Sequence, residues 1–270
     1  MSRKVSLAHL SLIAQPPEQL VAIAAQAGFD LVDLRLSPAT PTDRVYDKTE
    51  RIQLCRALLP RLADAGLKVW DVEIIRINDR TQPEDHLPLM EAANLLGARR
   101  LKAVCDSDDE SLSADLLARL AELAAPFGLT LDLEYMIFSG VKSLSRALAV
   151  TAAASQPNLQ VLVDALHWMR AGDTVADLSA APAGSIGYCQ LCDGPREAPL
   201  GREALITEAR TRRLAPGEGE FPLLVLLETM PPDFPVSIEV PLPPGQEPLG
   251  HARHLLTATR NLTQKQDAMP

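Results

Sequence analysis

The sequence predicts an α/β fold, a (β/α)8 TIM barrel forming a single domain over residues 1–270. Short β-branched or apolar runs alternate with amphipathic Ala/Leu-rich runs along the chain, and eight such pairs can be counted. Alternating strands and helices of this kind build a parallel sheet. The alternative is a doubly wound open sheet, but no Gly-x-Gly-x-x-Gly follows the first predicted strand.

The individual elements follow from hydrophobic periodicity and from punctuation by Gly and Pro. Strands are predicted at residues 4–12, 29–36, 67–77, 99–106, 129–136, 159–166, 185–193 and 235–242. Helices are predicted at residues 16–28, 47–66, 83–98, 110–128, 141–155, 174–181, 221–231 and 249–264. Gly28 and Gly66 mark two of the helix ends. A longer loop is expected between the seventh strand and the helix that follows it.

Composition excludes several classes of protein. The formal charge is −9 and no block of lysine or arginine occurs, which disfavours a nucleic-acid-binding surface. No uncharged apolar run reaches the roughly 18–20 residues of a membrane span. The four cysteines are too sparse for a disulfide framework, so we expect a cytoplasmic protein.

Four polar side chains end four late strands, where the mouth of a barrel carries its chemistry. They are Glu134, Asp164, Gln190 and Glu239. A carboxylate in a packed barrel layer is costly unless it is paired or bound to a metal. Three carboxylates and an amide oxygen suit Mn, Mg or Co, with Zn also possible. The alternative is that each acid caps the next helix or lies in a surface loop.

The seventh predicted strand contains the pair Cys189-x-x-Cys192. Positions three apart on a strand point to opposite faces, so the two sulfur atoms should diverge. No second cysteine pair exists to complete a four-cysteine zinc site. This segment is therefore interpreted as a barrel strand that presents Gln190, and not as a redox or zinc motif.

The whole chain resembles the sugar phosphate isomerase/epimerase family, within the xylose isomerase-like TIM barrel superfamily. The resemblance is carried by an ordered set of segments: "AGFDLVDLR", "MEAANLLGARRL", "LDLEYM", "LVDALHWMR", "YCQLCDGP", "RRLAPGEGE" and "VSIEVP". In that family Glu, Asp, His and Glu from strands five to eight hold a divalent metal. Gln190 stands where most members carry His, which is similar to the pattern of bacterial 3-dehydroshikimate dehydratases.

The resemblance also implies roles for neighbouring residues. His167 follows Asp164 in a D-x-x-H pattern and would handle a proton beside the metal. Arg213, before the Gly-rich loop, and Arg76, after the third strand, would bind the substrate. Asp193 either orients a ligand or holds the turn before Gly194.

The resulting hypothesis is a metal-dependent isomerase or epimerase of a sugar or polyol ketone. Glu134 or Glu239 would remove the proton next to the carbonyl, and the metal would stabilise the enediolate. Expulsion of a β-hydroxyl after the same first step gives the alternative, a dehydratase of the 3-dehydroshikimate or inosose type, with His167 as proton donor.

Two further classes are weighed against these enzymes. An apurinic-site endonuclease of the same barrel needs several histidine ligands, and this chain has only 5 histidines. A barrel that binds a metabolite without turnover stays open. The expected partner is a small sugar, polyol or cyclic ketone, with no nucleic acid or membrane, and the family implies a possible homo-oligomer.

Overall fold

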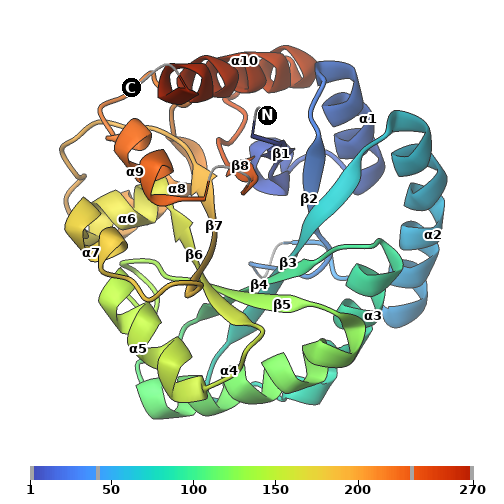
Figure 1. The fold of residues 1–270 in the computed structure, drawn as a ribbon. Helices are drawn as coiled ribbons and strands as arrows, with labels where there is room; N and C mark the ends of the chain where they lie inside the picture. The colour runs from blue at the N-terminus through green and yellow to red at the C-terminus, as the bar shows by residue number, and fades with distance from the viewer. Residues whose placement is uncertain (1–2, 41–42, 232–233, 268–270) are drawn as a thin grey trace.

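Eight parallel strands close into a barrel in sequence order, as Figure 1 shows. The computed structural model describes residues 3–40, 43–231 and 234–267. The strands are β1 (Val5–Leu7), β2 (Leu31–Arg35), β3 (Lys68–Ile77), β4 (Arg100–Cys105), β5 (Thr130–Glu134), β6 (Leu159–Asp164), β7 (Ile186–Leu191) and β8 (Val236–Ile238). The closing pair joins β1 to β8. The predicted fold class is confirmed.

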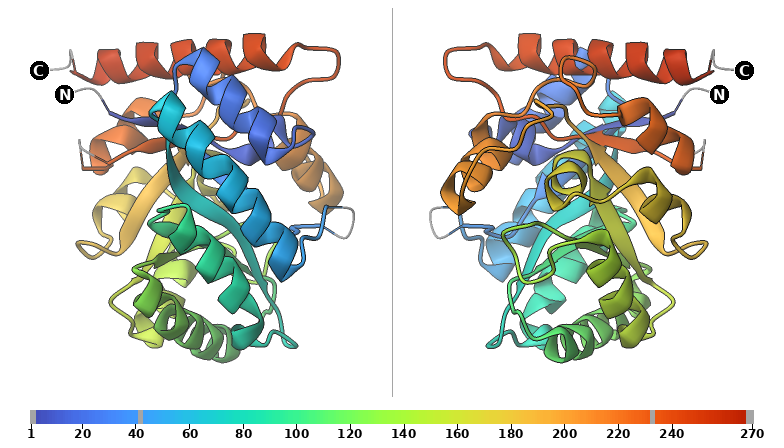
Figure 2. Two further views of the ribbon diagram at one scale, coloured as in Figure 1. Left: turned by 90° about the vertical axis from the view of Figure 1, so that its right-hand side faces the viewer. Right: turned by 90° about the vertical axis from the view of Figure 1, so that its left-hand side faces the viewer.

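Helices surround the barrel, and α10 lies along one side of the molecule in both views of Figure 2. The α-helices are α1 (Pro17–Ala27), α2 (Lys48–Ala65), α3 (Leu87–Leu95), α4 (Glu110–Ala124), α5 (Leu144–Ala154), α6 (Ala165–Ala171), α7 (Val175–Ser179), α8 (Arg202–Thr211), α9 (Leu223–Thr229) and α10 (Pro248–Asp267). Three 3-10 helices are η1 (His9–Leu12), η2 (Pro83–His86) and η3 (Ala125–Phe127). No helix within the described ranges is long and apolar enough to cross a membrane.

Local chemistry explains most helix boundaries. Gly28 and Gly66 end α1 and α2 in the left-handed conformation, with φ of 91° and 65°, which costs glycine little because it has no Cβ. Asp47 begins α2 with a capping box that includes Glu50. These signals are visible in the sequence, and the predicted helix ends at Gly28 and Gly66 are confirmed.

The prediction was wrong in three places. The first strand ends at Leu7, and residues 9–12 turn into η1 instead of extending the strand. Helix α6 begins at Ala165, inside the run predicted as strand, because the Asp164 side chain caps it. Helix α8 lies within the predicted long loop, and its N-cap, Gly201, offers no side-chain signal.

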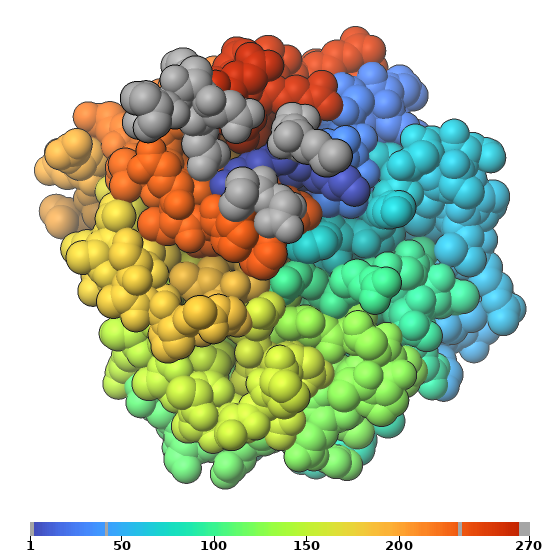
Figure 3. Space-filling view, viewed as in Figure 1, coloured from blue at the N-terminus to red at the C-terminus, as the bar shows by residue number. Residues whose placement is uncertain are grey.

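The interior of the barrel is polar, although such interiors are usually filled by branched apolar side chains. Alternate residues of neighbouring strands carry charged groups that are buried, because residues i and i+2 share a face of a strand. These inward groups include Asp33, Arg35, Asp71, Glu73, Arg100, Lys102, Asp132 and Glu134. The apolar core lies outside the barrel, between strands and helices. Atoms fill the middle of the ring on the visible face (Figure 3).

Below the mouth, hydroxyl groups donate hydrogen bonds to two fully buried aspartates. Asp33 accepts hydrogen bonds from Ser6 and Ser237, and Asp71 accepts one from Tyr188. Burial raises the pKa of Asp33 to about 7, against the lowering effect of the two hydroxyl donors. The folded protein therefore holds a proton on Asp33 under conditions where the unfolded chain has released it.

This proton predicts a stability that falls as pH rises from about 4 to about 7. In that window the folded state binds more protons than the unfolded state, and a tenfold difference in proton affinity is worth about 1.4 kcal/mol. Asp33→Asn should reduce the fall in unfolding free energy between pH 5 and pH 8, measured by urea denaturation. The exposed Asp115→Asn is the control. Equal falls in the wild type and Asp33→Asn would contradict the assignment.

Candidate active site

Five of the seven predicted site residues line a cavity at the carboxyl ends of the strands. The cavity has a volume of about 310 Å³. Its lining includes Arg76, Lys102, Glu134, His167, Arg213 and Glu239. These groups come from β3, β4, β5, α6, the segment after α8 and the end of β8. Barrel closure therefore assembles chemistry from six separate segments at the mouth, where barrel enzymes carry out their reactions.

The four predicted metal ligands are adjacent in the structure. Strand register pairs Asp164 with Gln190 and Gln190 with Ser237, which places Glu239 just beyond. One oxygen from each of Glu134, Asp164 and Glu239 lies within 4.8 Å of the other two. Gln190 donates from Nε2 to Glu239 Oε1 at 3.4 Å. The sequence prediction that these four side chains converge is consistent with this geometry.

Asp164 has a structural task as well as a place in this cluster. Its Oδ1 accepts from the backbone N–H groups of Leu166 and His167, at 2.9 Å and 3.1 Å, and so begins α6. Its Oδ2 accepts from Arg213 Nη1 at 2.6 Å. The sequence left open whether Asp164 caps a helix or belongs to a ligand cluster. In the structure it caps α6 and also contributes an oxygen to the acidic cluster.

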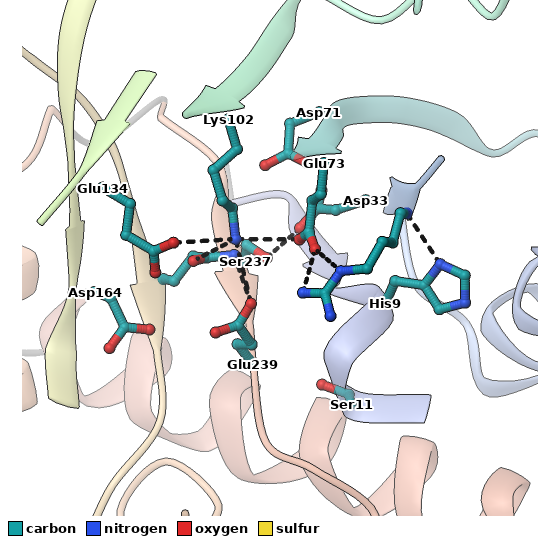
Figure 4. Close-up of polar contacts among 12 residues, drawn as sticks. His9, Ser11, Asp33, Asp71, Glu73, Lys102, Glu134, Asp164, Ser237 and Glu239 are labelled. Carbon is teal, nitrogen blue, oxygen red and sulfur yellow. Dashed lines mark hydrogen bonds and ion pairs between the residues drawn. The ribbon is translucent and has the colours of Figure 1, made fainter. Parts of the chain in front are cut away.

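Lys102 lies at the centre of the site and was not predicted (Figure 4). Its Nζ donates to Gln190 Oε1 at 3.0 Å and to Glu239 Oε1 at 3.2 Å. Glu73 Oε1 is 3.1 Å away and Glu134 Oε2 is 3.8 Å away. The side chain is 1% exposed. Burial favours the neutral amine, but the surrounding carboxylates raise the pKa of Lys102 well above its usual value, so it is an ammonium.

A signal for Lys102 and Glu73 exists in the sequence. Both interrupt apolar strand residues, in "RLKAVC" and "VEII", and a charge in the middle of a buried strand needs a partner. Both lie in the middle of their strands, whereas the predicted ligands lie at strand ends. Arg35 completes the group because its Nη2 donates to Glu73 Oε2 at 2.8 Å.

The two glutamates of the cluster differ in their electrostatic environment. Glu134 accepts no hydrogen bond from the described residues, and burial raises its pKa to about 8. Burial also acts to raise the pKa of Glu239, but Lys102 and Arg213 overcome it and hold that pKa at about 2. Arg213 Nη2 lies 3.0 Å from Glu239 Oε2. Glu134 can therefore take up a proton near neutral pH, whereas Glu239 is held as an anion.

His167 lies beside Glu134, as the D-x-x-H pattern suggested. Its Nε2 is 3.9 Å from Glu134 Oε1, and its Nδ1 has no partner among the residues the structure describes. Burial lowers the pKa of His167 to about 4, with Asp164 opposing that effect. The imidazole is therefore neutral at physiological pH and is a weaker base than the neighbouring Glu134 carboxylate.

The arginines of the cavity have different partners. Arg213 is buried, where it bridges Asp164 and Glu239 and donates to the Ala209 carbonyl at 2.7 Å. Arg76 makes a two-pronged ion pair with Asp106 at the rim. Arg210 also lines the cavity, and its exposed side chain has no partner in the described part of the chain. Arg213 is thus built into the wall, and Arg210 is available to a ligand.

A divalent cation fits the acidic cluster of Glu134, Asp164 and Glu239, called the upper cluster below. Its members are hard oxygen donors, which Mg, Mn and Co prefer, and Glu134 is a buried carboxylate without a hydrogen-bond donor. A second acidic group, Asp33, Asp71 and Glu73, is equally compact. None of these three residues lines the cavity, whereas Glu134 and Glu239 do, so the upper cluster is the better metal site.

Asp193 holds the loop that follows Gln190. Its Oδ1 accepts from the N–H groups of Gly194 and Phe221, at 2.8 Å and 2.9 Å. Its Oδ2 accepts from Gly217 N–H at 2.9 Å. These contacts tie residues 194–221 to the end of β7. Of the two sequence interpretations, the turn-holding one agrees with the observed contacts.

The match to a family model extends over residues 21–261, and the model describes the xylose isomerase-like TIM barrel. The chain belongs to this family. The resemblance on which the sequence analysis relied is thereby confirmed.

A curated protein and two solved structures are similar to this chain. The chain is 29% identical over 232 residues to a 3-dehydroshikimate dehydratase of Pseudomonas aeruginosa, an alignment covering 81% of this chain and 34% of that protein. The chain thus spans about a third of its curated relative. The zinc-bound IolI protein has a similar structure, with a TM-score of 0.80 at 17% identity, and 98% and 100% of the two chains covered. An L-ribulose 3-epimerase gives 0.73 at 18% identity, with 99% and 96% covered.

Removal of the Asp193 carboxylate should destabilise the protein. Asp193→Ala leaves three N–H groups without their acceptor, and each buried unpaired group costs about 1–3 kcal/mol. With partial compensation by water we expect a loss of about 2–4 kcal/mol in unfolding free energy, measured by urea denaturation. Asp193→Asn keeps one oxygen and should cost less. An unchanged stability of Asp193→Ala would refute this role.

Proposed function

We propose that the chain is a divalent-metal-dependent enzyme that removes the proton next to a ketone carbonyl. Glu134, Asp164, Gln190 and Glu239 would hold Mn, Mg or Co, with Zn possible. When bound, such an ion polarises the carbonyl and stabilises negative charge on its oxygen. The observation that carries the proposal is the buried Glu134 carboxylate, which lines the cavity beside the oxygens of Asp164 and Glu239 and accepts no hydrogen bond from the described residues.

The difference between the two glutamates supports dehydration as the outcome. Epimerisation by two bases needs a second group that exchanges protons on the opposite face of the substrate. Glu239 is ill suited to this because Arg213, whose Nη2 lies 3.0 Å from Glu239 Oε2, holds it as an anion. Dehydration needs one base and a way to protonate the leaving hydroxyl. The sequence alone favours a ketose isomerase, and this difference between the glutamates favours a dehydratase instead.

In the proposed reaction Glu134 takes the proton from the carbon next to the carbonyl. The electron pair of that C–H bond forms a C=C bond as the β-hydroxyl leaves. Glu134 then passes the proton to the departing hydroxyl, and the neutral imidazole of His167, with Nε2 3.9 Å from Glu134 Oε1, would orient that hydroxyl. The net change is the loss of one water molecule.

The substrate class is inferred from the cations at the mouth. Arg35 and Arg76 are paired with Glu73 and Asp106, whereas Arg210 is free to bind an anion. A guanidinium suits a substrate carboxylate. Together with the similarity to a 3-dehydroshikimate dehydratase, this supports a small cyclic hydroxyketone that carries a carboxylate.

Ketose 3-epimerisation is the second candidate. Oxygen atoms of Glu134 and Glu239 lie within 4.8 Å of each other, which would allow two carboxylates to act on one carbon. A change of metal coordination that freed Glu239 from its cations would be required for this reaction.

A panel of substrates should separate the two reactions. The purified protein is incubated with Mn, Co or Mg and with 3-dehydroshikimate, inosose or ketohexoses. We expect a new ultraviolet absorbance from the conjugated product of dehydration, and no ketose interconversion by NMR. EDTA should abolish turnover, and added metal should restore it. Turnover in a sample verified to be metal-free would refute metal dependence.

Glu134→Gln should remove the proton acceptor and weaken the metal site. We expect kcat to fall about 10²–10⁴-fold, the usual contribution of a positioned base, together with a lower bound-metal content by elemental analysis. Glu122→Gln, on the exposed face of α4, is the matched control. Unchanged metal content and ligand binding in Glu134→Gln would count against the site.

Arg210→Gln should raise KM for a carboxylated substrate at least tenfold with little change in kcat, because it removes a charge that would bind substrate and transition state equally. The neighbouring Arg212, exposed and absent from the cavity lining, gives the matched control Arg212→Gln. The effect should vanish when the substrate is an uncharged ester. Equal KM values in the two variants would argue against a carboxylate subsite.

A further inference from the structure

Lys102 presents its ammonium to the same oxygens that the proposed metal requires. Nζ donates to Gln190 Oε1 at 3.0 Å and to Glu239 Oε1 at 3.2 Å. It lies 3.8 Å from Glu134 Oε2. In Figure 4 dashed lines join Lys102 to Glu134 and Glu239. Three of the four proposed ligands thus lie close to one positive charge.

An ammonium and a divalent cation compete for such a site. Both need the oxygen lone pairs, and two cations repel each other strongly where few water molecules screen them. Lys102 cannot withdraw into solvent, since its side chain is 1% exposed. If these oxygens bind a metal ion, the Lys102 ammonium must therefore find another anionic partner inside the barrel.

Glu73 supplies that partner on the far side of Lys102. Its Oε1 is 3.1 Å from Nζ but accepts no geometrically good hydrogen bond from the described residues. Its Oε2 is occupied by the Arg35 guanidinium, through Nε at 3.1 Å and Nη2 at 2.8 Å. The lysine stem is flexible, so a small rotation would bring Nζ fully onto Glu73 Oε1.

We propose that Lys102 is a movable counter-cation that sets the metal affinity of this site. It competes with the metal for Gln190 and Glu239, and Glu73 is the anion that lets it give way. The inference rests on the metal-binding part of the proposed function, and it does not depend on which substrate the enzyme takes. Lys102 thereby acts as a positioning residue for the ligand oxygens.

The test is direct binding of Mn²⁺ to the full-length protein. Titration calorimetry and the metal-induced rise in Tm are measured on metal-stripped wild type, Lys102→Gln, Lys102→Met and Glu73→Gln. We expect at least tenfold tighter Mn²⁺ binding when Lys102 loses its charge. We expect at least threefold weaker binding in Glu73→Gln, where the ammonium loses its second partner. Lys102→Met is the second variant in case the first does not fold.

The matched control is Arg100→Gln. Arg100 is a second inward-facing cation of β4, paired with Asp132 at 2.6 Å and donating to Gln160 at 3.1 Å, and it contacts none of the proposed ligands among the described contacts. Its loss should change Mn²⁺ affinity by less than threefold, which distinguishes competition at the site from a general change in barrel charge.

Each result decides between the proposals. Equal or weaker Mn²⁺ binding in both Lys102 variants, with a wild type that binds Mn²⁺, overturns the counter-cation role and leaves the metal-dependent function intact. If Mn²⁺ binds to the Lys102 variants but not to the wild type, the ammonium excludes the metal completely, which supports competition. Absence of Mn²⁺ binding in every folded protein overturns both this inference and the metal dependence of the proposed function.

Discussion

The structure depends on the neutralisation of charge inside the barrel. Most parallel barrels fill this space with branched apolar side chains, but here the interior holds carboxylates from β2, β3, β5 and β6. Isolated buried charges of one sign would be prohibitively costly. Lys102, Arg35 and Arg213 reach into this acidic interior and make it stable. The chemistry of the mouth is therefore built on the same ion pairs that allow the barrel to close.

Fold and site share residues at several points. Asp164 begins α6 and also contributes an oxygen to the acidic cluster. Arg213 connects that oxygen to Glu239 and to the end of α8. Such shared residues position the cluster on rigid elements, which suits a site that must hold several oxygens at once. They also mean that substitution of Asp164 or Arg213 would disturb the fold and the site together.

The sequence predicted much of this arrangement because its signals are local. Strand alternation and polar strand ends identified Glu134, Asp164, Gln190 and Glu239. Lys102 was not predicted because the role of a lysine in the middle of a strand depends on partners that are distant in the sequence. Helix α8 escaped because Gly201 offers no capping side chain, and α6 because Asp164 also reads as the end of a strand.

The sequence by itself determined the barrel, the family and the four oxygen donors that gather at its mouth, because periodicity and strand-end chemistry depend only on neighbours along the chain. Only the tertiary structure decided how charge is distributed among them. Lys102 and Glu239 are 137 residues apart, and closure of the barrel alone brings them within hydrogen-bonding distance. That contact separates Glu239, held as an anion, from Glu134, which can take up a proton, and pKa differences of this kind arise only from three-dimensional proximity and burial.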